Sequence, residues 1–219
     1  KIEQVVKARF PQARVLRMDM DTTRTKDGYE QILSAFSNHE ADILIGTQMI
    51  VKGHDFPGVT LVGVLAADLS LYISDYRASE RTFQLLTQAA GRAGRGDIPG
   101  NVIIQTYDPD HYSITTAKEQ NYEAFYGQEI EYRKMMRYPP VWNMLYILCA
   151  SKNEAAASEA AVALVGKIDQ IVRENSEKIF SIGPSDAPVA KISDVYLKVL
   201  YVKTREYQTL VILKDGLEA

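Results

Sequence analysis

The first half of the chain alternates short apolar runs with stretches of helical periodicity. Four runs have the length and the aliphatic content of buried strands: 13–18, 42–46, 60–65 and 101–107. Helical spacing of apolar residues is found at three places: 1–9, 27–37 with Asp27 as its cap, and a stretch that ends at the Gly-Arg repeat of residues 91–95. Strands that alternate with helices predict βαβ units and a parallel sheet, which is the α/β class of fold.

The second half follows a different pattern. Apolar residues at helical spacing predict one helix over 111–137, and Tyr138-Pro139-Pro140 ends it because proline cannot continue a helix. The remainder predicts a small α+β unit in the order β-α-β-β-α: strand 141–150, a helix capped by Asn153, strands 178–182 and 195–203, and segment 206–217. That last segment is compatible with helix or strand, and helix is favoured. We therefore predict three parts: 1–112, a helical connector 113–140, and 141–219.

Composition adds few constraints. The 219 residues are 46% hydrophobic and 24% charged, as in ordinary globular proteins. No apolar run approaches the roughly 20 residues that span a bilayer, and no signal peptide opens the chain, so we expect a cytoplasmic protein without a membrane partner. The single cysteine, Cys149, lies in an apolar run and is expected to be a buried thiol. The three histidines are scattered without ligand spacing, so no metal site is expected in this chain.

The charge does not suggest a typical nucleic-acid binder. The net charge is -3, whereas such proteins commonly carry a basic surplus. Residues 1–112 contain 12 basic and 14 acidic side chains, and the rest contains 13 and 14. Any contact with nucleic acid must therefore be local.

The Gly-Arg repeat is one candidate site. Arg92 and Arg95 are three residues apart and each follows a glycine, so at the end of a helix they would share one face. Two planar guanidinium groups aimed the same way suit a polyphosphate, because each can bond two oxygens at once. The alternative is a solvated helix end without chemistry.

The segment from Gly46 to Pro57 is the other candidate site. It directly follows an apolar strand, and ligands of parallel sheets gather at the carboxyl ends of strands. Gly53 permits a close approach to a ligand. Lys52 is compatible with a solvated position or with a DNA contact, and His54 with a hydrogen-bonded turn or with chemistry. Loop 69–74 exposes apolar and aromatic side chains that could stack on a base or pack against a neighbouring domain.

The order of these segments resembles motifs V and VI of superfamily 2 helicases, which belong to the second RecA-like lobe. Gly53-His54-Asp55-Phe56-Pro57 and Ala78-Ser79-Glu80-Arg81-Thr82 narrow the resemblance to the PriA family of replication-restart helicases (primosomal protein N′). The turn Gly183-Pro184-Ser185-Asp186-Ala187-Pro188 is similar to one in the C-terminal domain of that family. Leu197 departs from the family pattern, where an arginine usually follows the aromatic residue of this strand.

The resemblance implies a RecA-like lobe 2 followed by a small α+β domain, within an ATP-dependent 3′→5′ DNA helicase that restarts stalled replication forks. It implies that ATP and Mg²⁺ bind between this lobe and another, with Arg92 and Arg95 at the γ-phosphate and Gln88 reporting the nucleotide state. Gly53 and Asp55 would lie near the ribose of the nucleotide. The residues implied at the DNA strand are Thr47, Gln48 and Lys52.

The chain contains no phosphate-binding loop, no Asp-Glu-x-His box and no cysteine-rich zinc region, which the family carries elsewhere. We therefore expect a C-terminal fragment that is inactive alone, with zinc only in the full-length protein. The expected partners are forked and single-stranded DNA, single-stranded DNA-binding protein and other primosome proteins. Two alternatives stay open: a lobe of another superfamily 2 translocase or RNA helicase, and a non-catalytic module that binds DNA or protein.

Overall fold

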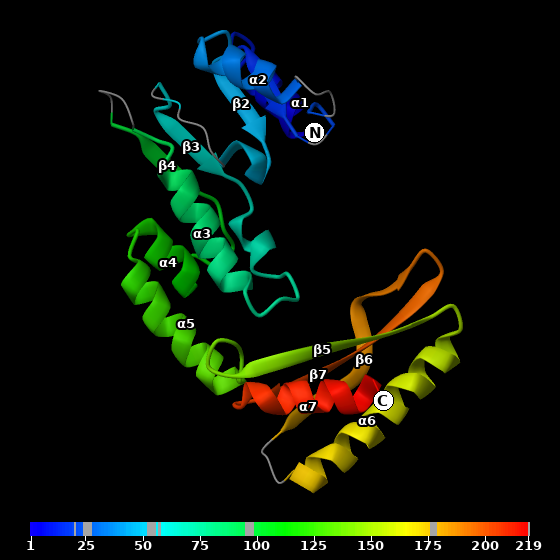
Figure 1. The fold of residues 1–219 in the computed structure, drawn as a ribbon. Helices are drawn as coiled ribbons and strands as arrows, with labels where there is room; N and C mark the ends of the chain where they lie inside the picture. The colour runs from blue at the N-terminus through cyan, green and yellow to red at the C-terminus, as the bar shows by residue number, and fades with distance from the viewer. Residues whose placement is uncertain are drawn as a thin grey trace. The chain divides into compact units, whose positions relative to one another are not determined.

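The computed structural model describes residues 1–19, 21–23, 28–51, 56, 58–94, 99–175 and 179–218. The chain divides into two compact units, Lys1–Phe125 (unit 1) and Tyr126–Ala219 (unit 2), and each is described by itself (Figure 1). The dividing point falls on helix α5 (Tyr122–Met136). The domain boundaries at residues 112 and 140 remain a prediction.

Unit 1 contains four short strands: β1 (Val15–Met18), β2 (Ile43–Gly46), β3 (Leu61–Val64) and β4 (Asn101–Ile104). They form two parallel pairs, β1 with β2 and β3 with β4. The parallel direction is confirmed, but the ladders of the described residues form two two-stranded sheets instead of one. Each pair is joined by a crossover that contains a helix, as expected for βαβ units.

The helices of unit 1 cover these strands. Its helical elements are α1 (Ile2–Arg9), α2 (Gly28–Ser37), α3 (Ala78–Ala90) and α4 (Tyr112–Lys118), with the 3₁₀ turns η1 (Gln48–Val51) and η2 (Ala67–Ser70). The predicted cap Asp27 lies outside the described residues. The α2 helix packs on β1, and α3 packs on β3, β4 and α4. The core around α3 includes the stacked rings of Phe83 and Phe125, whose centroids are 4.3 Å apart.

The single helix predicted over 111–137 is wrong, because the structure has two helices there, α4 and α5. Gln120 lies between them with φ 52°, in the left-handed region, and the amide of Asn121 bonds the carbonyl of Thr116. The side chain of Asn121 then accepts a hydrogen bond from the amide of Ala124 at 2.9 Å, which starts α5. A left-handed residue that is not glycine leaves no signal in the sequence. The apolar periodicity runs on across Gln120, so the sequence predicted one continuous helix.

Unit 2 is a three-stranded antiparallel sheet covered by two helices. Its elements are β5 (Asn143–Ser151), α6 (Glu154–Asn175), β6 (Phe180–Ile192), β7 (Val195–Thr204) and α7 (Tyr207–Glu218), with strand order β5-β7-β6. The predicted order of elements is confirmed, including the final helix. The predicted strand end at residue 182 is wrong, since β6 continues to Ile192. Register shifts after Ile182 and Asp186 let β6 pass Gly183-Pro184 and still pair with β7.

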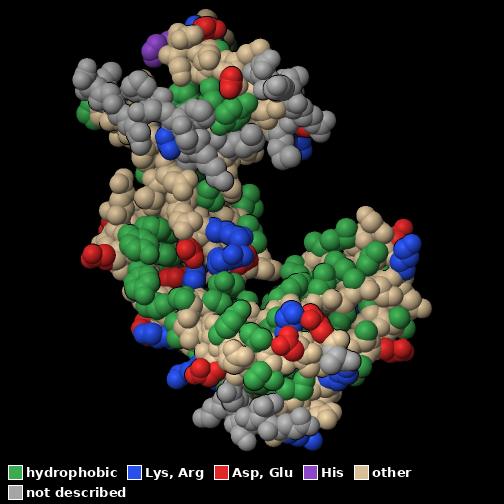
Figure 2. All heavy atoms as spheres, viewed as in Figure 1, with side chains coloured by type: hydrophobic (Ala, Val, Ile, Leu, Met, Phe, Trp, Pro, Cys, Tyr) green, Lys and Arg blue, Asp and Glu red, His purple; other side chains and the backbone are tan. Residues whose placement is uncertain are grey.

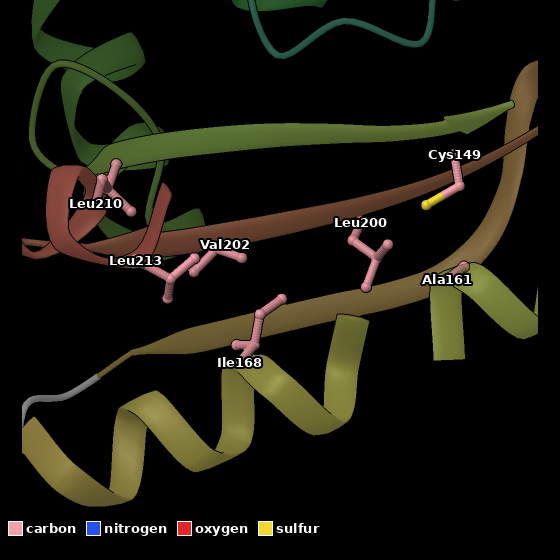
Figure 3. Packing of buried hydrophobic residues seen from close by; sticks show 7 residues of the cluster. All are labelled: Cys149, Ala161, Ile168, Leu200, Val202, Leu210 and Leu213. Carbon is pink, nitrogen blue, oxygen red and sulfur yellow. The ribbon is translucent and has the colours of Figure 1, made fainter. Parts of the chain in front are cut away.

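The core of unit 2 lies between the sheet and the two helices. Figure 1 shows α6 and α7 on the same side of the sheet, and Figure 3 shows side chains from both helices pointing at β5 and β7. The buried members of this cluster are Cys149, Ala161, Ile168, Leu200, Val202, Leu210 and Leu213. Aliphatic packing therefore holds this unit together.

Two local predictions for this half are confirmed, and one buried ion pair is found. Cys149 is a buried free thiol, and burial raises its pKa. The side chain of Asn153 accepts from the amide of Ala156 at 3.2 Å and so caps α6. Glu129 and Arg133 pair at 2.6 Å, and the pair is buried. A buried pair that loses one partner leaves an uncompensated charge, so this pair matters more than an exposed one.

The pair Arg14–Asp42 gives unit 1 a testable pH dependence. Asp42 accepts from the Arg14 side chain at 2.8 and 3.1 Å and from its amide at 2.8 Å. These bonds lower the pKa of Asp42 from 3.8 to about 2. A lowered acid pKa stabilises the fold above pH 3.8, and this stabilisation is lost as the pH falls through about 2. We expect Asp42→Asn to reduce the fall in the free energy of unfolding between pH 3.8 and about 2. Urea unfolding followed by circular dichroism measures this free energy at each pH. Asp110→Asn, at an exposed position, should keep the wild-type dependence of the free energy of unfolding on pH. An equal pH dependence in both variants would contradict the role assigned to the Arg14–Asp42 pair.

Candidate functional site

The first candidate segment begins where β2 ends. Gly46 is the last residue of β2 and stands opposite Met18 of β1, and Thr47 leads directly into η1. Thr47 and Gln48 are both exposed, so their hydroxyl and amide groups face solvent at the carboxyl end of the strand. Such strand ends are where parallel sheets bind ligands. The described part of this segment therefore presents polar groups at the expected edge.

Gly46 is required by close packing. A Cβ atom there would lie 2.3 Å from the carbonyl oxygen of Met18, which is fixed in the ladder, and 2.5 Å from Cδ1 of Ile50. We expect Gly46→Ala to lower the free energy of unfolding by about 1–3 kcal/mol, because the strand must shift to relieve the overlap. Gly63→Ala in β3 is the matched control, since nothing lies within 4 Å of its Cβ position. Urea unfolding measures both, and equal stability of the two variants would contradict the packing argument.

The second candidate segment lies at the end of α3. Gln88 is exposed in the last turn of the helix. Arg92 follows the final helical residue, Ala90, and is partly buried. The amide of Arg92 bonds the carbonyl of Ala89 at 3.1 Å, which tightens the chain after the helix. The prediction that Arg92 lies on the helix is therefore wrong, because Arg92 lies in the turn beyond α3. Whether it shares a face with Arg95 stays a prediction, because Arg95 lies outside the described residues.

Backbone contacts tie this turn to the chain just after the first segment. Gly94 has φ 74°, and its amide bonds the carbonyl of Val59 at 3.1 Å. A Cβ on Gly94 would lie 2.6 Å from the amide nitrogen of Gly100, so the chain passes very close to itself here. The α3 helix also packs on η1. The structure thus places α3 against η1, the turn that directly follows β2.

Several predicted site residues lie outside the described part of the chain. These are Lys52, Gly53, His54, Asp55 and Arg95. Their places in the site stay predictions, as do the roles of Thr47, Gln48, Gln88 and Arg92. In the described ranges, no group of three His, Cys, Asp or Glu side chains is arranged to hold a metal ion.

Asp68 links η2, which precedes α3, to the residues after β4. Sequence reasoning did not find this contact. It is 3% exposed, and it accepts from the Thr106 hydroxyl and from the amides of Tyr107 and Asp108 at 2.9 and 3.2 Å. The Thr106 bond, followed by the two amides, lowers the pKa of Asp68. These bonds also explain why the strand predicted over 101–107 does not continue to residue 107: Thr106, Tyr107 and Asp108 bond Asp68 instead of a strand. Because the partners are 38 to 40 residues away, no local pattern could reveal this anchor.

The loop predicted to expose apolar side chains does so. Leu69 and Tyr72 are 72% and 73% exposed. The loop is fixed at both ends, by Asp68 and by Asp75, whose carboxylate pairs with Arg77 and Arg81 at 3.0 and 2.9 Å. Stacking on a base and packing on another domain both remain compatible with this exposure.

Comparisons with known proteins match two successive parts of the chain to two families. Residues 1–97 match the family described as helicase conserved C-terminal domain, and residues 134–219 match the primosomal protein N C-terminal domain. The chain is therefore a helicase-family domain followed by a primosomal C-terminal domain, and the predicted fold class, a RecA-like lobe and a small α+β domain, is confirmed. Across the part that the structure describes, no helix has the length and apolarity needed to cross a bilayer.

Relatives named replication restart protein PriA match nearly the whole chain. The Bacillus subtilis protein is 46% identical over 220 residues, which cover 100% of this chain and 27% of the relative. The Synechocystis protein is 42% identical over 203 residues, covering 93% of this chain and 24% of the relative, and the Chlamydia pneumoniae protein is 40% identical over 205, covering 93% and 27%. The chain belongs to the PriA family of replication restart proteins.

Proposed function

We propose that this chain is the C-terminal part of an ATP-dependent 3′→5′ DNA helicase that restarts stalled replication forks. The observation that carries the proposal is the meeting of two segments in unit 1. Thr47 leads into η1, which begins at Gln48 and packs on α3. Gln88 lies in the last turn of α3, and Arg92 lies in the turn just beyond it. One segment suits a nucleic-acid strand and the other a nucleotide, so a single rigid element can couple the two.

The role proposed for the arginines is that of an arginine finger. The guanidinium groups of Arg92 and Arg95 would bond oxygens of the terminal phosphate of ATP held by another lobe. Charge spreads over those oxygens during phosphoryl transfer, and a fixed guanidinium stabilises it. Gln88, one turn earlier on α3, would move with the arginines and so respond to loss of the phosphate. ATP supplies the phosphoryl group, while these side chains bind and orient it.

The role proposed for the first segment is to hold the DNA strand. The hydroxyl and amide of Thr47 would donate to a backbone phosphate, and Gln48 and Lys52 would add contacts to the same strand. Asp55 would accept from a ribose hydroxyl of the nucleotide, with Gly53 allowing the close approach. Since these contacts address the backbone, they would allow movement along any sequence.

Further components belong to our proposal for the full-length protein. Mg²⁺ is assigned to the first motor lobe and zinc to a cysteine-rich region, both outside this chain, as the resemblance to the family implies. The proposed partners are forked and single-stranded DNA, single-stranded DNA-binding protein and other primosome proteins, in the cytoplasm at the nucleoid. The proposed domains are residues 1–112, 113–140 and 141–219.

We expect residues 1–219 alone to lack ATPase activity, because the sequence contains no phosphate-binding loop. A coupled phosphate-release assay with and without single-stranded DNA tests this expectation. The control is a full-length replication restart protein that carries this segment, which should hydrolyse ATP faster with DNA than with RNA. DNA-stimulated turnover by the 219-residue chain would contradict the proposal, and stimulation by RNA alone would favour an RNA helicase.

A further inference from the structure

Two arginines of unit 2 converge on one tryptophan, and a lysine lies near one of them. The guanidinium carbons of Arg137 and Arg205 lie 5.6 and 5.3 Å from the centre of the Trp142 ring system. The Arg137 guanidinium also lies 3.4 Å from the ring centre of Phe180. Arg137 follows α5 and Arg205 follows β7, so the fold brings them together across 68 positions of sequence. The third cation, Lys203, stands two residues before Arg205.

Lys203 is an internal part of this cluster. It is 4% exposed, its Nζ donates to the carbonyl oxygen of Met136 at 3.0 Å, and it lies 3.8 Å from the ring centre of Tyr138. The carbonyl belongs to the last residue of α5, where helices leave such groups without a partner. Burial and the nearby charge of Arg137 lower the pKa of Lys203. The lysine therefore positions the end of α5 and carries a positive charge that a nearby anion would stabilise.

Arg137 occupies a position that normally favours glycine. Its φ is 57°, its amide bonds the carbonyl of Lys134, and the amide of Tyr138 bonds the carbonyl of Arg133 at 2.8 Å. This pair of bonds is the Schellman arrangement, in which the left-handed residue after the helix is usually glycine because a Cβ is unfavourable there. The backbone thus gains nothing from an arginine at residue 137. The guanidinium is the part of this residue that could be useful.

Carboxylates do not neutralise these cations. Across the described ranges, no Asp or Glu oxygen lies within 4.0 Å of the charged nitrogens of Arg137, Lys203 or Arg205. Many other cations of the molecule do have such partners, and Figure 2 shows Lys and Arg side chains beside Asp or Glu over much of the visible face. The paired cations of unit 2 are Arg133, Lys134, Lys191, Lys198 and Lys214. The Trp142 cluster is therefore a local positive site on an acidic chain.

We propose that Arg137 and Arg205, held on the rings of Phe180 and Trp142 beside Lys203, bind the phosphodiester backbone of single-stranded DNA. The proposal rests on the proposed function for its ligand and adds a second contact, on unit 2, to the one at Thr47. Guanidinium groups bond phosphate oxygens two at a time, and a ring that covers one face fixes their plane. Cations interleaved with aromatic rings are typical of surfaces that track a single strand. Such a contact is local, as the net charge of -3 requires.

The test measures binding of a fluorescein-labelled oligothymidylate to the 219-residue chain by anisotropy at several salt concentrations. We expect R137G and R205A each to weaken binding several-fold and the double variant to weaken it further. Each lost phosphate contact should reduce the slope of log K against log salt by about 0.7. The matched control is K152A, which removes an exposed charge of unit 2 away from the cluster. R137G should fold normally, because glycine readily adopts a φ of 57°.

Trp142 gives a second readout, since it is the single tryptophan of the chain. Oligothymidylate should change its fluorescence in the wild type and K152A, and the change should be absent from the double variant. If the chain binds DNA but the arginine variants keep wild-type affinity and slope, the inference is overturned while the proposed function stands. If no DNA binds at all, both are overturned. Binding of an acidic peptide at the cluster, with no effect of DNA on Trp142, also overturns the inference.

Discussion

Arg92→Ala is expected to lower ATP turnover about a thousandfold or more in a full-length replication restart protein that carries this segment. Removing an arginine finger has an effect of this size because the transition-state charge loses its fixed cation. The affinity for forked DNA should stay nearly unchanged, since the proposed DNA contacts lie at the end of β2 and on unit 2. Steady-state ATPase kinetics and fork-binding anisotropy on the same preparation measure both quantities.

The kinetic pattern separates chemistry from folding. We expect kcat to fall with little change in KM for ATP, because the finger acts in the transition state more than in binding. The same loss is expected for Arg95→Ala, which the sequence places beside Arg92. Arg9→Ala, an exposed arginine at the end of α1, is the control and should keep wild-type turnover. A wild-type rate for Arg92→Ala would remove Arg92 from the proposed nucleotide site.

Ile168→Ala should destabilise unit 2 by about 2–5 kcal/mol, the range for truncation of a fully buried aliphatic side chain. Ile168 is 0% exposed and points from α6 at the sheet (Figure 3). The substitution leaves a cavity between α6 and the strands that rigid aliphatic neighbours cannot fill. Urea unfolding followed by the fluorescence of Trp142 measures this change, because that tryptophan belongs to unit 2.

The control for this prediction lies on the same helix. Val162 is 59% exposed, so Val162→Ala removes no core contact. Its effect should stay within about 0.5 kcal/mol, as for most surface substitutions. Alanine is also the better helix former, which favours a small gain. Similar losses for both variants would contradict the core assigned to α6.

The sequence located most elements because their signals are local. β2 could be found from three aliphatic residues in a row, and α6 from apolar residues at helical spacing with Asn153 as a cap. The candidate site was found for the same reason: the Gly-Arg repeat and Thr47 belong to short, contiguous motifs. These motifs also carried the resemblance to the PriA family, which the relatives then confirmed.

Errors arose where the decisive partner is distant in sequence. The break at Gln120 depends on a left-handed backbone that no glycine marks. The length of β6 depends on its pairing with β7, which continues past a Gly-Pro pair. The helical position predicted for Arg92 depended on where α3 ends; the helix stops at Ala90, and the turn beyond it bonds the carbonyl of Val59 through Gly94.

The amino-acid order by itself determined the class of fold, the parallel direction of the strands in unit 1 and the segments that carry the proposed chemistry. Tertiary structure alone decided that Asp68 anchors residues 106–108, that α3 packs on the turn after β2, and that Arg137 and Arg205 share one tryptophan. The physical reason is the range of the forces involved. Helical and strand periodicity act over a few neighbours, whereas a buried carboxylate or a stacked guanidinium finds its partner only after the chain has folded.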